Sequence, residues 1–356
     1  MSIKGLTYGL ILLTSWLPLS APQPTEKDLA APQKEVTGLV YHRFGDDRYP
    51  STNISLSNFE AHLSFLQEKG YQSVTFTEAL EYLNSRKKQK PTICITIDDG
   101  FRSFFENGIP LLEQYGMKAT VFINTSSVGQ PDYMDWDEIK AMIEYGIEIG
   151  NHSHEHQYFL NLPEAERAQR FEEDLKQSQA IFQEHLGMSP TIFAYPYGEF
   201  DTSLQEVLKK YGFTGAAAQN SGVMSPSMDF FAAPRFAMSN SFGRPQAFMN
   251  KASMKSLDAR VVKVHSTGYM GSPEHPRLEI NFKEKDYQLR QLQCFVQGVR
   301  ATKSLRVIKD NVVKLSVKSV DELTDRRTVF TVTVPDANRQ WHWFSYVYVR
   351  PEIEAP

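Results

Sequence analysis

The chain has 356 residues, a length that suggests roughly two domains and provides ample apolar material for a hydrophobic core. Its formal net charge of −4 gives no general case for a nucleic-acid-binding protein, and we expect no nucleic-acid partner. Cys94 lies within a predicted buried strand and Cys294 in a separate predicted domain, so we expect two free thiols and no disulfide framework.

The first 21 residues are typical of an export signal. Lys4 precedes an apolar stretch at residues 6–19, which is short for a membrane span of about 20 residues. We expect a signal peptide at residues 1–21, or an uncleaved signal anchor that tethers the protein to a membrane, followed by a Pro- and Ala-rich linker at residues 22–35. The sequence therefore predicts an exported protein, either periplasmic or extracellular.

From residue 36 onward, strand and helix patterns alternate. The expected strands are residues 36–42, 72–76, 92–97, 119–123, 147–150, 191–195, 213–217 and 231–236. The expected amphipathic helices are residues 56–69, 104–115, 136–145, 163–186 and 202–211. Repeated βα units predict an α/β fold with a parallel sheet, a distorted (β/α) barrel, over residues 36–250. Barrel active sites form at the carboxyl ends of strands.

Two adjacent carboxylates, Asp98 and Asp99, close the apolar run at residues 92–97. Neighbouring like charges make it unfavourable for both groups to ionise without a cation. If a metal holds one carboxylate, the other is free to act as a base. A turn or a helix N-cap would also explain an isolated Asp-Asp-Gly sequence.

Three histidines follow within five residues, His152, His154 and His156, out of nine in the chain. One helical turn would place His152 and His156 on the same side and point His154 elsewhere. Two histidines and one carboxylate form a facial ligand set that leaves positions open for water and substrate. The sequence predicts a divalent metal site that favours Zn²⁺, although Co²⁺, Ni²⁺ or Fe²⁺ would also suit these ligands.

Together these segments resemble the NodB-type polysaccharide deacetylases of carbohydrate esterase family four. Residues 96–100 look like the first motif of that family, residues 152–156 look like its His-Ser/Thr-x-x-His motif, and residues 193–198, Phe-Ala-Tyr-Pro-Tyr-Gly, match a third. The resemblance covers residues 36–245 and implies a distorted barrel of the NodB deacetylase type.

The resemblance also implies roles for individual residues. Asp98 would be the catalytic base, and the backbone N–H of Tyr197 would help to stabilise the oxyanion. The residues that would hold the metal are Asp99, His152 and His156.

The chain departs from the family pattern in two places. Many members carry an Arg that orients the base where this chain has Ala194. Arg235 ends the last expected barrel strand and could reach Asp98 across the barrel mouth, although a surface ion pair would also explain this arginine. The family's general acid lies on a late Leu-x-His strand, for which the late candidate here is His265.

A better match for the general acid lies near the other end of the chain, at residues 38–42, Gly-Leu-Val-Tyr-His. This order looks like the circularly permuted arrangement of the deacetylases that act on biofilm poly-N-acetylglucosamine. We therefore favour His42 over His265 as the general acid. The expected catalytic set is His42, Asp98, Tyr197 and Arg235.

From about residue 255 the pattern changes to strands separated by turn residues, with little helix. The expected strands are residues 261–264, 278–282, 289–297, 312–317, 328–334 and 341–349. They suggest a small all-β sandwich resembling an immunoglobulin-like domain at residues 255–352. Aromatic residues at 341–348 could stack on sugars, but period-two alternation into the sandwich core explains much of this pattern, and we favour the core.

The function predicted from these features is metal-dependent removal of N-acetyl groups from a polysaccharide that contains N-acetylglucosamine. The position of His42 and the form of the third motif favour a β-1,6-linked substrate, while chitin oligomers and peptidoglycan remain open. Two other hypotheses remain. One is an inactive carbohydrate-binding protein on a deacetylase scaffold, which the replacement of Arg by Ala194 would favour. The other is an esterase that removes O-acetyl groups from a polysaccharide.

Overall fold

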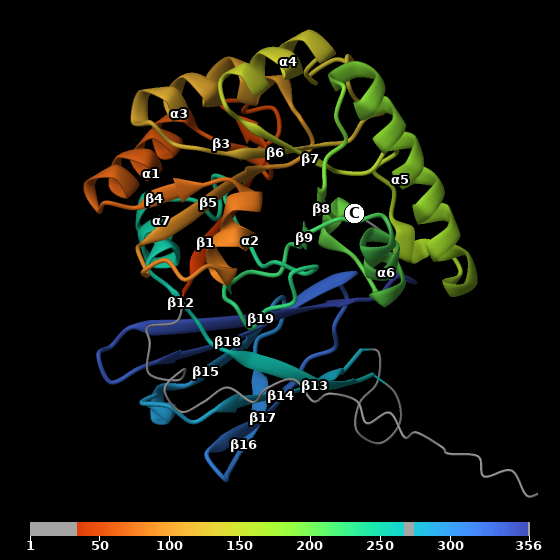
Figure 1. The fold of residues 1–356 in the computed structure, drawn as a ribbon. Helices are drawn as coiled ribbons and strands as arrows, with labels where there is room; N and C mark the ends of the chain where they lie inside the picture. The colour runs from red at the N-terminus through yellow and green to blue at the C-terminus, as the bar shows by residue number, and fades with distance from the viewer. Residues whose placement is uncertain (1–33, 267–273, 355–356) are drawn as a thin grey trace, which may run out of the picture. The chain divides into compact units, whose positions relative to one another are not determined.

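The computed structural model describes residues 34–266 and 274–354 of the chain (Figure 1). The predicted export signal at residues 1–21, and the linker up to residue 33, lie outside these residues. Within the described ranges, no helix is both long and apolar enough to cross a membrane. Cys94 and Cys294 are both free thiols, as the sequence predicts.

A curled sheet with mostly parallel strands forms the centre of the N-terminal part. Its hydrogen-bonded order is β10-β1-β5-β6-β7-β8-β9, with β4 beside β5 and β11 beside β1. The strands are β1 Val36–Tyr41, β4 Gln72–Val74, β5 Thr92–Ile97, β6 Thr120–Ile123, β7 Glu148–Asn151, β8 Ile192–Ala194, β9 Gly215–Ala217, β10 Val223–Met224 and β11 Phe236–Ala237. A two-stranded sheet pairs β2 Arg43–Phe44 with β3 Asn53–Ile54. All residues of β1 and β5 are buried, as expected for strands covered on both faces.

Residues 230–237 bring the two ends of the curled sheet together. On one side, Ala216 N–H donates to the carbonyl of Phe230 and Ala218 N–H donates to the carbonyl of Ala233, both at 2.9 Å. On the other side, β11 pairs with β1 in parallel, with Phe236 opposite Leu39. This segment therefore lies between β9 and β1, and it carries Arg235.

Helices follow the strands, and most of them cover the outer side of the curled sheet (Figure 1). The exception is α2, Phe76–Asn84, which packs in a separate core with Cys94 and Phe122, on the opposite face of β5 and β6. The helices are α1 Leu56–Glu68, α2 Phe76–Asn84, α3 Ile109–Tyr115, α4 Trp136–Glu144, α5 Glu164–Leu186, α6 Thr202–Lys210 and α7 Pro245–Ala252. Their starts are encoded locally: Ser55 caps α1, and Asp135 forms a capping box with Glu138 at α4. Their apolar faces pack onto the strands, as Leu63 and Met142 do in the core that contains Ile95.

The predicted α/β class with a parallel sheet is confirmed, and the sheet is a curled half-barrel. Three expected elements of the N-terminal part differ. Phe76 begins α2 instead of ending a strand. The expected helix at residues 104–115 begins with a π-helical turn, Phe104–Gly108. Of the expected strand at residues 231–236 only Phe236 lies in a strand, because the preceding residues turn between β9 and β1.

The C-terminal part is all-β, as predicted, and contains two four-stranded sheets. Their orders are β12-β19-β18-β15 and β13-β14-β17-β16. The strands are β12 Lys255–Ser256, β13 Ala259–His265, β14 Arg277–Lys283, β15 Gln293–Val296, β16 Thr302–Lys309, β17 Val312–Ser319, β18 Arg327–Pro335 and β19 Trp341–Val349. The expected strand at residues 289–297 begins instead with a 3₁₀ turn, Leu289–Gln291. Side chains from both sheets meet in one core, as Ile280 and Leu315 from one sheet do with Val332 from the other.

Three aromatic side chains of β19 pack against other parts of the protein. Phe344 and Tyr346 pack against the core between the two sheets. Trp343 packs its ring edge-on against Phe236, with centroids 5.4 Å apart, and its indole N–H donates to the carbonyl of Ser221 at 3.1 Å. The interpretation of this strand as alternating core residues, which the sequence favours over a sugar-stacking strip, agrees with these contacts.

Candidate active site

The carboxyl ends of the parallel strands carry most of the residues that the sequence singles out. This follows from the topology, because parallel strands all end at the same edge of a sheet. These residues are His42 after β1, Asp98 and Asp99 after β5, His152 after β7 and Tyr197 after β8. Arg235 instead lies just before β11, so the expectation that it ends a strand is wrong.

Asp98 and Arg235 form a fully buried, bidentate ion pair. The two guanidinium nitrogens Nη1 and Nη2 lie 2.7 and 2.8 Å from the two carboxylate oxygens, and neither side chain is exposed to solvent. Arg235 also donates to the hydroxyl of Thr96 at 2.8 Å and, through Nε, to the carbonyl of Ala218 at 3.0 Å. The contact that the sequence predicts between Arg235 and Asp98 is therefore present, and the alternative of a surface ion pair is wrong.

This pair determines the charge of Asp98. Burial raises the pKa of the Asp98 carboxyl, but the positive charge of Arg235, with a smaller effect from His152, more than offsets burial, so that the pKa lies below its usual value. Asp98 is therefore an ionised carboxylate in a site without solvent contact, and its aim is fixed by two hydrogen bonds.

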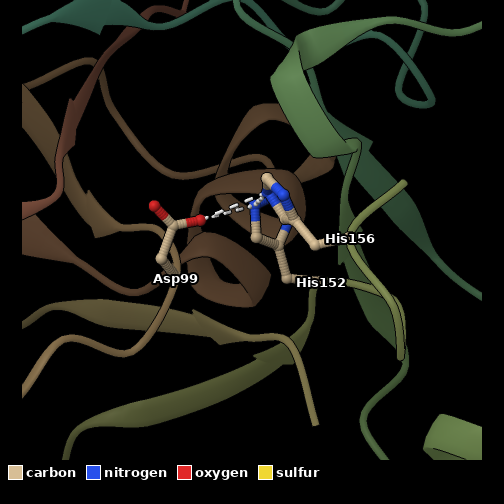
Figure 2. Close-up of side chains that lie close together, drawn as sticks. All are labelled: Asp99, His152 and His156. Carbon is tan, nitrogen blue, oxygen red and sulfur yellow. Dashed lines mark hydrogen bonds and ion pairs between the residues drawn. The ribbon is translucent and has the colours of Figure 1, made fainter. Parts of the chain in front are cut away.

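Asp99, His152 and His156 converge on one point beside that pair (Figure 2). Nε2 of each histidine lies 3.3 Å from Oδ1 of Asp99, and the two Nε2 atoms lie 3.1 Å apart. Bonds of about 2.0–2.2 Å from a divalent ion would separate neighbouring ligand atoms by about 3.0–3.5 Å. The three donor atoms thus fit a single divalent metal ion.

The orientation of His152 supports the same interpretation. Its Nδ1 lies 2.7 Å from the carbonyl oxygen of Ala194, so Nδ1 carries the proton and donates it, while the lone pair of Nε2 is directed at the cluster. Ligating histidines in proteins are commonly held by such a contact on the second nitrogen. Ala194, which replaces the family's usual Arg, thus contributes through its backbone.

The histidine segment is not helical, and the predicted helical turn is wrong. Ser153 and His156 have positive φ angles of 70° and 53°, so the chain turns sharply twice. The N–H of His156 donates to the hydroxyl of Ser153. The N–H groups of His154 and Glu155 donate at 2.7 and 2.8 Å to the carboxylate of Asp174 on α5. A hydrogen-bonded turn, rather than helical spacing, brings the two imidazoles together.

Sequence reasoning missed Asp174, although a sequence signal existed. A carboxylate on the buried face of an amphipathic helix needs a partner, and Asp174 is 6% exposed. His154 points away from the metal cluster, as predicted: its Nδ1 lies 2.8 Å from the hydroxyl of Thr125, and its Nε2 lies 2.8 Å from the amide nitrogen of Gln177.

Tyr197 has a left-handed backbone, with φ 58° and ψ 3°, in the short 3₁₀ turn Pro196–Gly198. A non-glycine residue seldom adopts this conformation without support from its surroundings. The Tyr197 ring stacks on Tyr158 with centroids 3.5 Å apart and meets the edge of His156 at 4.6 Å. The turn is thereby tied to the metal cluster.

Of the two candidates for the general acid, His42 is the one near the carboxylates. Burial acts to raise the pKa of the Asp99 carboxyl, but the close imidazoles of His152 and His156 lower it well below its usual value, and His42 adds a further lowering. His42 also contributes to the low pKa of Asp98, after the larger effects described above. His265 instead lies on β13, where it contacts Glu279 at 3.3 Å.

Fold and site together define an α/β protein with an ionised carboxylate beside three side chains whose donor atoms fit a divalent metal ion. Residues 85–216 match the model of the family described as polysaccharide deacetylase. This part of the chain therefore carries the sequence pattern of a polysaccharide deacetylase, and the resemblance and the enzyme class that the sequence predicts are confirmed.

The relatives agree with this assignment. YxkH of Bacillus subtilis is 28% identical over 202 residues, 56% of this chain and 70% of that protein. A poly-beta-1,6-N-acetyl-D-glucosamine N-deacetylase of Staphylococcus aureus is 26% identical over 216 residues, 58% of this chain and 74% of that protein. Among solved structures, IcaB from Ammonifex degensii is similar with a TM-score of 0.55 and 26% identity, covering 62% of this chain and 98% of that one.

The first testable prediction concerns the metal ligands. His152→Ala removes one of three donor atoms, so we expect the affinity for Zn²⁺ to fall by more than the roughly 10–100-fold that loss of an outer partner costs. The matched control is His154→Ala, two residues away, whose imidazole contacts Thr125 and Gln177 instead. Competition titration against a chelator measures both affinities. An equal loss in the two variants would remove His152 from the ligand set.

A second prediction concerns the charge of Asp98. In Arg235→Ala, burial acts on this carboxyl without its main opposing charge, so its pKa should rise. The acidic limb of the pH profile of kcat/KM should then move to a pH about 1–3 units higher, with the Zn²⁺ content unchanged. Arg235→Lys keeps the charge and should show a smaller displacement. An acidic limb that stays in place in Arg235→Ala would mean that another group keeps Asp98 ionised.

Proposed function

We propose that this protein is a metal-dependent N-deacetylase that removes acetyl groups from a polysaccharide containing N-acetylglucosamine. The observation that carries the proposal is the ionised, arginine-bound Asp98 immediately beside the cluster of Asp99, His152 and His156. The name of the Staphylococcus aureus relative, a poly-beta-1,6-N-acetyl-D-glucosamine N-deacetylase, favours the β-1,6-linked polymer as substrate.

Zn²⁺ is the ion we propose for the three-residue cluster, since two imidazoles and one carboxylate suit it well. When bound, such an ion supplies a water whose pKa is lowered from 15.7 to about 7, and it polarises the substrate carbonyl.

The residues of this chain would then divide the proton transfers. Asp98 accepts the proton of the attacking water, because each of its oxygens retains a lone pair beyond the bond from Arg235. The backbone N–H of Tyr197 donates to the carbonyl oxygen as negative charge develops on it. His42, in its protonated form, donates to the sugar nitrogen as the C–N bond breaks, since an amide anion is too basic to leave unprotonated. The products are acetate and the free amine.

We assign each part of the chain a role in this activity, in order from the N-terminus. We assign residues 1–21 to export, so that the enzyme works in the periplasm or outside the cell, and residues 36–250 to the deacetylase domain. The matched lengths of the relatives, 202 and 216 residues, support an extent of this size. Residues 255–352 would form an immunoglobulin-like accessory sandwich, a proposal supported by two antiparallel-rich sheets around one core.

The direct test is release of acetate from β-1,6-linked N-acetylglucosamine oligomers, with and without a chelator. The proposal requires release that the chelator abolishes and that added Zn²⁺ restores. O-acetylated oligomers serve as the comparison substrate. Release from these alone would instead favour the esterase, and no release from either substrate would favour a carbohydrate-binding protein.

A third prediction separates the general acid from the metal ligands. His42→Ala should slow amide hydrolysis by about 10²–10⁴-fold, the usual contribution of general acid–base catalysis, with unchanged affinity for Zn²⁺. An activated acetyl ester should lose far less rate, because its leaving group needs little protonation. His265→Ala is the control and should keep full activity. The assignment fails if His265→Ala shows the larger loss, or if His42→Ala loses its metal.

A further inference from the structure

The turn that carries Tyr197 needs support from outside itself. Tyr197 and Gly198 are two consecutive residues in the left-handed region, with φ angles of 58° and 69°. For tyrosine this conformation costs free energy, so it persists only where neighbouring groups hold it. The proposed oxyanion donor is the N–H of this residue, and its direction depends on those neighbours.

A buried ion pair fixes the residue that follows this turn. Glu199 lies two positions after Tyr197, and its carboxylate accepts from Arg326 Nε at 2.8 Å and from Nη2 at 2.7 Å. The side chains of Arg326 and Glu199 are only 3% and 2% exposed. Arg326 belongs to the C-terminal part, directly before β18, 127 residues further along the chain. A bidentate contact of this kind sets orientation as well as distance.

The guanidinium of Arg326 is itself held in place. Its Nη1 donates to the carbonyl oxygens of Pro351 and Ile353 at 3.1 and 3.0 Å. All three nitrogens of the guanidinium are thus engaged, and the group cannot turn without losing several hydrogen bonds. Arg326 therefore acts as a fixed point that belongs to the C-terminal part.

The same guanidinium reaches Tyr197 by a second route. Its central carbon lies 4.6 Å from the centroid of the Tyr158 ring, a cation–π contact. Tyr158 in turn stacks on Tyr197, with an angle of 7° between the rings. Arg326 thus holds both the residue that follows the turn and the ring on which Tyr197 lies.

A neighbouring arginine, Arg327, contacts the turn indirectly, through Gln219. Both Nη atoms of Arg327 lie 3.3 Å from Oε1 of Gln219. Gln219 in turn packs so closely on the turn that a Cβ added to Gly198 would lie 2.5 Å from the Cβ of Gln219. Arg326 and Arg327 thus reach the active-site turn by three routes. One is the ion pair with Glu199, directly after the turn. The others run through Tyr158 to Tyr197 and through Gln219 to Gly198.

We propose that Arg326 and Glu199 are positioning residues of the active site, through which the C-terminal β part holds the Tyr197 N–H in the direction that the reaction requires. The proposal rests on the function proposed above and deepens it: the C-terminal part completes the catalytic site. A deacetylase domain without this arginine would fold its sheet and bind metal, but it would stabilise the oxyanion poorly.

The test compares variants with similar stability but different contacts. Arg326→Gln breaks the ion pair. The double variant E199M/R326M replaces both charges with apolar side chains, which commonly restores stability after loss of a buried ion pair. Val332→Ala is the matched control: Val332 lies on β18 in the core of the C-terminal part and is fully buried. For each variant, kcat and KM are measured with β-1,6-linked N-acetylglucosamine oligomers as substrate. The affinity for Zn²⁺ and the free energy of unfolding in urea are measured on the protein without substrate.

We expect Arg326→Gln to lower kcat about 10-fold with little change in KM or Zn²⁺ affinity, because an oxyanion donor acts mainly in the transition state. E199M/R326M should regain stability and keep the low kcat, whereas Val332→Ala should lose stability and keep kcat. Recovery of kcat in the double variant, or an equal fall of kcat in Val332→Ala, would overturn the proposal.

Amide hydrogen exchange separates this inference from the function on which it rests. Exchange in a peptide that spans residues 195–201 should accelerate about 10-fold in Arg326→Gln and stay unchanged in Val332→Ala, whether or not a substrate is turned over. An inactive wild-type protein with this exchange pattern would refute the proposed function alone. Unchanged exchange in Arg326→Gln would refute the positioning role of Arg326 and Glu199, even in an active enzyme.

Discussion

The buried ion pair between Asp98 and Arg235 is the interaction on which the rest of the site depends. Two adjacent carboxylates at the end of a fully buried strand would repel each other and lose their hydration, and either effect favours protonation. Arg235 supplies the missing charge from a distant part of the chain. Burying such a pair is itself unfavourable unless the remaining donors find partners, and Thr96 and the carbonyl of Ala218 provide them. The ion pair also depends on the curl of the sheet, because the segment at residues 230–237, which carries Arg235, lies between β9 and β1.

The cluster of Asp99, His152 and His156 requires the opposite arrangement, a carboxylate whose charge no arginine balances. Asp99 faces two histidines, so its charge is available to a cation, while the charge of Asp98 is already balanced by Arg235. Asp98 and Asp99, although adjacent in the sequence, thereby have different electrostatic environments. Asp99 also has a left-handed backbone, with φ 74°, and its carboxylate contacts both histidines. Differences of this kind between paired carboxylates are a common basis for dividing chemical roles.

The elements that the sequence predicts well are those whose signal is local. Strand β5 follows directly from six apolar or β-branched residues in a row, and α4 follows from an amphipathic pattern that begins at a capping box. The contact of Arg235 with Asp98 was predicted from a strand end at the barrel mouth, but Arg235 precedes β11 and reaches Asp98 because its segment lies between β9 and β1. The turn of the histidines was not predicted, because Asp174 on α5 organises it through hydrogen bonds across some 20 residues. Strand β16 also lacked a signal, since it is an edge strand with mostly exposed residues. The contact of Arg326 with Glu199 joins residues 127 positions apart, and no local pattern marks either partner.

A double-mutant cycle on Asp98 and Arg235 tests the central claim most directly. In the metal-free protein, the free energy of unfolding in urea is measured for Asp98→Asn, Arg235→Met and the double variant. Each single change should cost about 3–5 kcal/mol, because it leaves one buried group without its partner, and the double variant should cost less than the sum by about 2 kcal/mol or more. The exposed pair of Glu206 and Lys209 is the control, for which the coupling should stay below about 1 kcal/mol. Additive effects at Asp98 and Arg235, within about 0.5 kcal/mol, would contradict the account.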